Sequence, residues 1–547
     1  MVMILKKNSF IEGTILAYIA ILLTKIIGAV YVIPFYKIIG ESGGVLYSYA
    51  YNVYNLFLNI STSGIPTAVS IIIAEYNALK MFNEREHAFK VANKVLSVLS
   101  VVAFLIMFVF AKEIANFFIS DIKGGNSIES IVLVIRVISF CILVIPFLSV
   151  TRGYLQGNKY VAVSSFSQLI EQVSRIFVVL VGSYVAINVL HYSIPTGVSV
   201  ALSGTVIGGI SALLFLKWKI HKNKKEFNKG VTGVEDSKVT DNEIIKKIFI
   251  HAIPVIVVAI TQNIYEMVDL KFIIKGLYMI GYNAKECEYI ASVVVTWGPK
   301  ICMVINALAI GLCASIIPFI VSSYVDKNTN ELNRKFNQAI NTILFVGLPL
   351  AAFIIIFSNE AYYIFYGMSK YGSIVLKLLS IVSIFFSLQM VINMSLQGMK
   401  KYKIIYLNTI VGAVVNAILD IPMILLLNKI GFYPYLGTLF STLIGQLISI
   451  SIVLISLRKE FKFNYKSILE TAVKVILSCI IMMIFMYILE SVIFNKDSYF
   501  ITLIKLGICG ILSVGSYILI SYKLGFMRQI LGDEMIDKML KKFKIKK

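Results

Sequence analysis

Long, predominantly apolar stretches recur along the whole chain and limit its fold more than any other feature. Of its 547 residues, 58% are hydrophobic and 15% are charged. A helix needs about 20 apolar residues to cross a hydrocarbon core of about 30 Å. Fourteen stretches meet that length, at residues 11–36, 45–75, 95–118, 128–151, 160–188, 195–217, 248–272, 289–324, 339–359, 371–397, 403–428, 434–457, 468–490 and 499–522. The sequence therefore predicts an all-α polytopic membrane protein with about 14 transmembrane helices.

The lysines and arginines are distributed unevenly between the two sets of connecting loops. Of 51 such residues, 35 lie at the termini and in alternate loops, 9 lie in the opposite loops and 7 lie inside the apolar stretches. Short loops rich in Lys and Arg stay in the cytoplasm, so we expect both termini there. The net charge of +22 then reflects membrane topology, and we expect no binding to nucleic acid.

One long polar segment divides the stretches after the sixth. It covers 219–246, is rich in lysine and is predicted to be a flexible cytoplasmic linker. The domains expected on this basis are an N-terminal lobe at 1–218, a C-terminal lobe at 247–460, two further helices within 461–524 and a basic cytoplasmic tail at 525–547.

Short matches between the two lobes suggest an internal duplication. Leu155-Gln156-Gly157 lies at the end of the fourth helix and Leu396-Gln397-Gly398 at the end of the tenth, while the second and eighth stretches carry helix breakers at Pro66 and Pro299. An even number of spans separates the matched pieces, so the lobes are expected to be parallel repeats. Transporters built from repeats place the substrate site between them, near the bilayer midplane.

Four cations lie deep within the apolar stretches. A charged side chain at the bilayer centre costs at least about 2.5–3.5 kcal/mol unless it faces a partner or water. We therefore expect these cations to face a central cavity. Because cationic side chains are the natural ligands of phosphates, the group favours an anionic substrate such as a pyrophosphate. Its members are Lys25, Arg136, Arg175 and Lys300.

Four acids also lie within the apolar stretches, and each has two interpretations. Glu171 precedes Arg175 by four residues on one helix face, either as a structural ion pair or as part of the substrate site. Glu266 and Asp269 also share a face, either at a solvated helix end or as an ion or proton site. Asp420 precedes Ile421-Pro422, where it satisfies a broken backbone or binds an ion or proton.

Catalytic and metal-binding motifs are nearly absent from the sequence. Gly40-Glu41-Ser42-Gly43-Gly44 matches G-x-S-x-G, but no strand precedes it, and we interpret it as a turn. The six cysteines are scattered, with Cys287 expected in a loop and the others in apolar segments. Gly204 and Gly208 form a GxxxG pair that predicts a close helix contact. We expect no enzymatic activity, no metal and no cofactor.

Three short motifs carry a resemblance to a known family. Thr24-Lys25-Ile26-Ile27-Gly28 resembles a first-helix S-[RK]-x-x-G pattern, Ser63-Gly64-Ile65-Pro66 resembles part of a second helix, and Leu155-Gln156-Gly157 recurs at the end of the fourth. The chain thereby resembles the lipid-linked oligosaccharide flippases of the multidrug/oligosaccharidyl-lipid/polysaccharide exporter superfamily. Within it, the chain is most similar to the lipid II flippases of Gram-positive bacteria and to the related stage V sporulation proteins.

This resemblance implies a function and a site. It implies a flippase in the bacterial plasma membrane that carries an undecaprenyl-pyrophosphate-linked peptidoglycan precursor, lipid II, to the outer leaflet by alternating access. Lys25 matches an arginine that binds the substrate pyrophosphate, whereas two other cationic positions are occupied by Tyr31 and by Leu58-Asn59. The two C-terminal helices would form a groove for the polyprenyl tail. The implied partners are the lipid-linked substrate, membrane lipids and cell-wall synthesis proteins.

Other functions compete with this interpretation. A second interpretation takes a lipid-linked precursor of a capsule, teichoic or spore polymer as the substrate. A cation-coupled multidrug exporter of the same fold would need a carboxylate in the middle of the first span, where this chain has Lys25. A membrane-embedded glycosyl or phosphoryl transferase would need clustered acids or a histidine at one face, and the sequence has neither.

Overall fold

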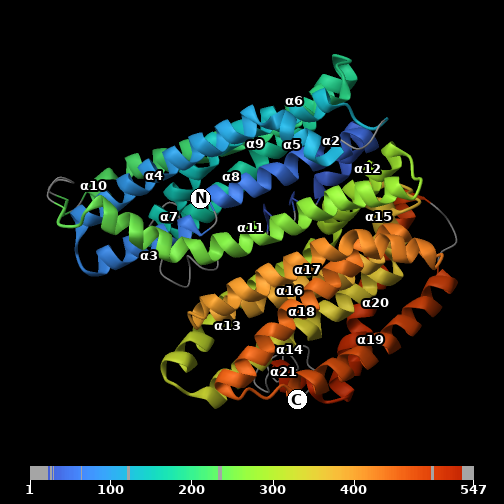
Figure 1. Ribbon diagram of the computed structural model, residues 1–547. Coiled ribbons are helices and arrows are strands. Elements are labelled where there is room, and N and C mark those ends of the chain that lie inside the picture. Colours follow the sequence, from blue (N-terminus) through green and yellow to red (C-terminus); the bar gives the residue numbers. More distant parts are fainter. Residues whose placement is uncertain are drawn as a thin grey trace. The chain divides into compact units, whose positions relative to one another are not determined.

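The structure of the protein is a computed structural model that describes residues 23–24, 27–28, 30–62, 64–119, 124–228, 230–231, 237–493 and 498–531 (Figure 1). Every regular element within these ranges is a helix, which confirms the predicted all-α membrane fold. Thirteen helices there are long and apolar enough to cross a membrane. They overlap the second to the fourteenth expected stretches, whereas the first, at 11–36, lies mostly outside the described residues.

The contacts divide the chain into two compact units, Met1–Ser292 and Val293–Lys547. This boundary falls inside the eighth expected stretch, so α11 (Asp241–Met279) and α12 (Ala284–Ser292) belong to the first unit. The lobes expected from the sequence repeat divide the chain elsewhere, and that assignment stays a prediction.

Two glycines shape the start of the first unit. At Gly40 the backbone is not helical, with φ 65° and ψ −173°, which matches the turn expected there. At Gly64, φ is 75°, and a Cβ would lie 2.9 Å from the carbonyl oxygen of Ala252 on α11. A glycine is therefore needed both for the left-handed backbone and for the close approach. Pro66 follows in the first turn of the next helix, as the predicted breaker.

The helices before α11 are α2 (Val32–Thr62), α3 (Ile65–Ala78), α4 (Phe82–Val109), α5 (Ala111–Ile119), α6 (Ile128–Ser139), α7 (Ile145–Gly157), α8 (Val161–Phe177), α9 (Ile194–Lys222) and α10 (Lys224–Phe227), with short η2 (Phe140–Leu143), η3 (Val178–Gly182) and η4 (Val185–Val189).

The second unit begins with a π-helical turn, η5 (Val293–Trp297). It continues through α13 (Gly298–Val325), α14 (Thr329–Ile356), α15 (Ser358–Tyr366), α16 (Gly372–Gly398), α17 (Tyr402–Lys429), η6 (Pro434–Leu436), α18 (Gly437–Phe461), α19 (Lys466–Ile493), α20 (Tyr499–Lys523) and α21 (Phe526–Leu531). The predicted breaker Pro299 lies in the first turn of α13, directly after the π-helical turn.

The same helix end recurs in the two units. The carbonyl of Leu155 accepts a hydrogen bond from the Tyr160 amide at 2.8 Å, and the carbonyl of Leu396 accepts one from the Lys401 amide at 2.8 Å. A Cβ at Gly157 would lie 2.6 Å from Ile73 of α3, in the first unit. In the second unit, a Cβ at Gly398 would lie 2.8 Å from Val321 of α13. The Leu-Gln-Gly matches thus mark equivalent local packing, which is what a duplication predicts.

The polar segment after α9 is anchored on the first unit. The buried Arg85 of α4 donates from its guanidinium to the carbonyl of Phe227. His87 Nε2 lies 2.7 Å from a carboxylate oxygen of Asp241, and Tyr160 donates its hydroxyl proton to Glu226. The described parts of 219–246 therefore contact α4 and the start of α8, whereas the sequence predicted a flexible linker.

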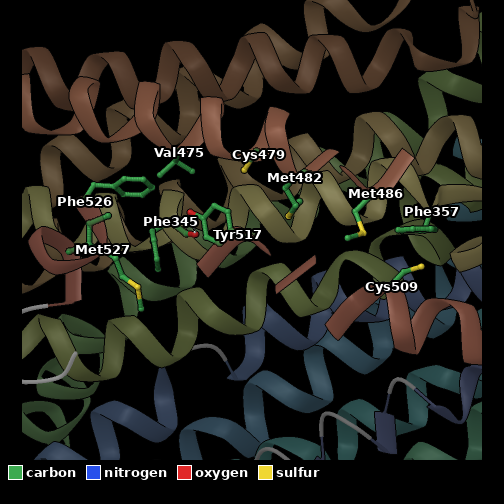
Figure 2. Close-up of a cluster of buried hydrophobic side chains, with 12 residues drawn as sticks. Phe345, Phe357, Val475, Cys479, Met482, Met486, Cys509, Tyr517, Phe526 and Met527 are labelled. Atoms are coloured by element: carbon green, nitrogen blue, oxygen red, sulfur yellow. Dashed lines mark hydrogen bonds between the residues drawn. The ribbon is translucent and has the colours of Figure 1, made fainter. Parts of the chain in front are cut away.

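The two last transmembrane helices pack on α14 of the second unit. Their cluster is rich in sulfur and aromatic side chains, and Figure 2 shows Met482 and Cys479 beside Tyr517. The Tyr517 hydroxyl donates to the carbonyl of Phe345 at 2.8 Å. Burial of large apolar side chains thus holds α19 and α20 to α14. The groove expected there for a polyprenyl tail stays a prediction.

Candidate functional site

A polar group on α8 is the candidate site of the first unit, and Arg175 is its central residue. Arg175 donates a hydrogen bond from Nη2 to Gln172 Oε1, one turn earlier on the same helix. Its Nε is buried and has no hydrogen-bond partner among the described residues. An arginine has five N–H donors, and leaving a buried donor unsatisfied costs about 1–3 kcal/mol or more. The guanidinium therefore has binding capacity left for a ligand.

Aromatic residues of and before α2 surround this guanidinium. Arg175 interacts electrostatically with the hydroxyl groups of Tyr31, Tyr47 and Tyr51. Tyr47 and Tyr51 stack with their ring centroids 5.3 Å apart, and the ring of Phe35 meets Tyr47 edge-on at 5.3 Å. Neutral phenols are dipoles and do not cancel a full positive charge. Among the groups that act on Arg175, only Glu171 carries a negative charge.

The nearby acid, Glu171, is paired with a different arginine. Arg152 Nη2 on α7 lies 2.8 Å from Glu171 Oε2, and Arg152 Nε donates to Ser167 Oγ at 2.8 Å. The expected partner on the same helix, Arg175, turns instead to Gln172. Glu171 is thus committed to a tertiary ion pair, which leaves the charge of Arg175 less compensated.

Sequence reasoning missed Arg152. The fourth stretch was expected to end at residue 151, which placed this arginine in a loop, but α7 continues to Gly157. The signal that could have found it is the Leu155-Gln156-Gly157 motif itself, because the repeated helix end lies after the arginine and not before it.

Two glycines of α9 set the position of α8. A Cβ at Gly208 would lie 2.6 Å from the carbonyl oxygen of Glu171 and 3.1 Å from the Cβ of Arg175. A Cβ at Gly204 would lie 2.9 Å from the carbonyl oxygen of Arg175. The structure confirms the close helix contact predicted for this GxxxG pair, and it shows that the contact supports the segment that carries the site.

Arg136 is not brought together with Arg175. It is exposed on α6, on the face opposite to the buried Ile131, Val134 and Ile138. Its guanidinium carbon lies 5.2 Å from the ring centroid of Phe108, and its Nε donates to the Phe108 carbonyl at 3.3 Å. Arg136 was predicted to face a central cavity. In the structure it is exposed, because the helical periodicity of α6 turns this side chain away from the buried face.

Lys25 lies outside the described residues. Gly28 is described, and a Cβ there would lie 2.9 Å from Gln172 Nε2. The segment that contains the predicted substrate lysine thus includes a residue beside the hydrogen-bond partner of Arg175. The role of Lys25 itself stays a prediction from sequence.

The predicted acids of α11, Glu266 and Asp269, lie in the first unit, as Arg175 does. Asp269 is buried and Glu266 is partly buried, and the two carboxylates interact with each other. Glu266 also interacts electrostatically with Tyr51. Because α11 continues for ten residues beyond Asp269, to Met279, a solvated helix end does not describe these two side chains.

In the second unit, Lys300 lies on α13 against an aromatic ring. Its Nζ is 4.2 Å from the ring centroid of Trp297, a cation–π distance. Trp297 is fully buried, and its carbonyl accepts a hydrogen bond from the Tyr366 hydroxyl at 2.9 Å. Lys300 thus has a structural contact, and its predicted role in substrate binding stays a prediction.

Asp420 belongs to a buried polar seam between α17 and α18. The Ser441 hydroxyl donates to Asp420 Oδ1, and the Thr442 hydroxyl donates to Asn416 Oδ1 at 3.0 Å. Asp420, Asn416 and Ser441 are all fully buried. Carboxylate, amide and hydroxyl oxygens gathered in a dry interior are the ligand types that bind hard cations.

Two family models match the chain. The model described as "Polysaccharide biosynthesis protein" matches residues 10–282, and the model described as "MatE" matches residues 254–421. The first includes α2, α8 and the residues around Arg175. The second includes α11 from residue 254 onward, α13 and Asp420 on α17.

Curated relatives and solved structures agree with these matches. The chain is 28% identical to "Lipid II flippase MurJ" of Bacillus subtilis over 96% of this chain and 97% of that protein. It is 21% identical to "Stage V sporulation protein B" of the same organism, over 75% of this chain and 77% of that protein. The solved structure "Lipid II flippase MurJ, inward closed conformation" matches 94% of this chain and 100% of that chain, with a TM-score of 0.64 and 16% identity, and shows that the fold is shared.

Proposed function

We propose that the chain is a flippase for lipid II, because residues 10–282 match the model described as "Polysaccharide biosynthesis protein" and nearly the whole chain is similar to the lipid II flippase of Bacillus subtilis. In this proposal it moves the undecaprenyl-pyrophosphate-linked precursor from the inner to the outer leaflet of a bacterial plasma membrane. The substrate class is carried over from the named function of the Bacillus subtilis relative, to which the chain is similar over almost its full length.

The observation that carries this proposal is the partly satisfied guanidinium of Arg175. Its buried Nε has no partner among the described residues, and the groups that act on the guanidinium are three tyrosine hydroxyls and the carboxylate of Glu171, which is paired with Arg152. A pyrophosphate supplies acceptor oxygens and negative charge, which together satisfy such a donor. In the proposed site, Arg175 and Lys25 contact the pyrophosphate, and the Arg152–Glu171 pair holds α7 against α8.

Growth of a bacterium depleted of its own lipid II flippase tests this function. We expect the wild-type chain to restore growth and the Lys25→Arg variant to retain most of the activity. Lys25→Ala and Lys25→Glu should lose the activity at unchanged membrane abundance. Normal rescue by Lys25→Ala would remove this lysine from the mechanism, and failure of the wild-type chain at normal abundance would contradict lipid II as the substrate.

The direction of transport rests on the predicted topology, and cysteine labelling tests it. Cys287 was expected in an accessible loop but is buried in α12, so it is not a suitable reporter. Lys285 and Lys225 are exposed on the same unit. In a Cys287→Ala background, an impermeant thiol reagent should label Lys285→Cys in intact cells and Lys225→Cys only after permeabilisation. The reverse pattern would contradict cytoplasmic termini.

A second candidate substrate is another lipid-linked polysaccharide precursor. The "Polysaccharide biosynthesis protein" match over 10–282 favours this alternative, since it covers the whole candidate site of the first unit. Lipid diphosphates with different glycans share the group that Arg175 would contact. Reconstituted protein assayed with lipid II and with such a glycolipid separates the two, because the preferred substrate should compete against the other.

The buried seam around Asp420 favours ion coupling as part of the cycle. Its oxygen ligands suit a monovalent cation, and Glu266 with Asp269 offers an acidic pair in the other unit. We propose that Asp420 binds the coupling ion. In liposomes, transport that follows a sodium gradient at zero potential would support this role, whereas transport that follows only an imposed potassium diffusion potential would contradict it.

A further inference from the structure

A groove at the basic end of α9 lies apart from the candidate site. It has a volume of about 710 Å³ and is walled by α4, α7, α9 and α10. Its apolar part is formed by Phe89, Phe147 and Leu213, and its polar part by Lys217, His221 and Lys224. Every residue named here is described, and all of them belong to the first unit.

The two parts of the groove follow one another along α9. Leu213, Lys217 and His221 are spaced four residues apart and so share one helix face. From Leu213 to His221 the helix rises by about 12 Å. The groove thus changes from apolar to basic over a length comparable with the join between an acyl chain and a phosphate headgroup.

The positive charge of the polar part is not neutralised from within the groove. None of the residues that line it is acidic. The nearby Glu226 of α10 accepts a hydrogen bond from the hydroxyl of Tyr160 at 2.5 Å and is not among the residues that line the groove. Lys217 and Lys224 are both exposed, so their ammonium groups are available to an anion.

An aromatic residue marks this end of α9 as an interfacial position. Trp218 is 48% exposed, and the Nζ of Lys222 lies 5.3 Å from its ring centroid. Exposed tryptophan beside lysine at the end of an apolar helix is typical of the membrane–water boundary. Basic pockets between transmembrane helices at that boundary suit anionic lipid headgroups.

We propose that this groove binds one anionic phospholipid. Lys217 and Lys224 contact its phosphate, and an acyl chain lies along Phe147 and Leu213. A free phosphate makes no contact with the apolar part of the groove. A zwitterionic lipid has no net negative charge, so its electrostatic attraction to the two lysines is weaker. The proposal is independent of lipid II transport, because neither Arg175 nor Lys25 takes part.

Lipid titration of the purified full-length protein, followed by native mass spectrometry, tests this proposal. The probes are dioleoylphosphatidylglycerol and dioleoylphosphatidylcholine. Lys217→Gln/Lys224→Gln should weaken binding of the anionic lipid by about tenfold, since two phosphate-directed charges are lost. The matched control Lys222→Gln/Lys225→Gln removes two exposed lysines of the same region that do not line the groove. It should change that affinity by less than about twofold.

Three further arms identify the ligand. Leu213→Ser should weaken retention of the anionic lipid, while inorganic phosphate at millimolar concentration should leave it bound. Displacement by inorganic phosphate would overturn the lipid assignment in favour of a free anion. Equimolar farnesyl diphosphate should not displace the lipid, and displacement would assign the groove to the transported substrate instead. Equal losses in both lysine pairs, or equal binding of phosphatidylcholine, would also overturn it.

Discussion

Two buried polar groups, one centred on Arg175 in the first unit and one on Asp420 in the second, carry opposite charges. In the first unit, the guanidinium of Arg175 is surrounded by tyrosine hydroxyls and keeps an unsatisfied buried donor among the described residues. In the second, the carboxylate of Asp420 lies in a seam of hydroxyl and amide groups. The first arrangement suits an anion and the second a cation. Net charge alone, at +22 for the chain, does not reveal this division.

The contrast arises on a shared framework. Both units repeat the Leu-Gln-Gly helix end with the same backbone hydrogen bond, and in both the glycine packs on the helix that follows a breaker. The two units thus agree in this backbone approach and differ in their buried polar side chains. The close helix contacts at Gly157 and Gly398 are therefore a shared feature of the architecture. The buried side chains around Arg175 and Asp420 are where the two units differ.

Removing the cation of the first unit should have the largest effect. Arg175→Gln is expected to lower transport by about 10³-fold, because loss of one partner of a buried charge pair costs about 2–5 kcal/mol. Flipping in proteoliposomes, normalised to protein amount, measures this. The control is Arg136→Gln, which alters an exposed arginine on Phe108 and should leave transport within about twofold. Equal losses in both variants would show that the structure does not separate their roles.

Breaking the Arg152–Glu171 pair should act on stability more than on binding. Glu171→Gln leaves Arg152 largely buried beside a neutral partner, and we expect unfolding to become easier by about 3 kcal/mol. Thermal unfolding of the purified protein measures the change. The double variant Arg152→Gln/Glu171→Gln should recover part of the loss, and an additive double variant would argue against a direct pair.

The ion site proposed at Asp420 predicts ion-dependent stability. Sodium at ten times its Kd should stabilise the wild-type protein by about 1.4 kcal/mol relative to choline, and Asp420→Asn should abolish that difference. Thermal unfolding in the two salts provides the measurement. Asp326→Asn, which alters an exposed carboxylate of the same unit, is the control and should keep the full response. An unchanged sodium response in Asp420→Asn would place the ion elsewhere.

The smallest effects should come from glycine substitutions. They compare the helix packing inside the first unit with that inside the second. Gly208→Ala forces a Cβ to within 2.6 Å of the Glu171 carbonyl, and we expect a net loss of about 1 kcal/mol. Gly515→Ala in α20 meets nothing within 4 Å and should be neutral or stabilising by up to about 1 kcal/mol. Thermal unfolding of both variants decides, and a tolerated Gly208→Ala would mean that α8 can move away from α9 freely.

The sequence by itself determined the class of the protein and the place of most of its spans. Apolar length is a local property, so thirteen expected stretches coincide with helices of the structure. Backbone punctuation is local as well, and the turn at Gly40 and the breakers Pro66 and Pro299 were therefore predictable. The GxxxG spacing likewise predicted that α9 would make a close contact.

Only the tertiary structure decided which charges meet. Spacing along one helix favoured Arg175 as the partner of Glu171, but Arg152 reaches that carboxylate from α7. Because both arginines lie deep in apolar stretches, Arg136 and Arg175 were both predicted to face a cavity. The rotation of α6 instead turns Arg136 outward. Sequence distance along a helix gives depth in the membrane, whereas the direction of a side chain and its partner depend on how neighbouring helices rotate and pack. For that reason the candidate cations were found from the sequence, and their separation into distinct roles was not.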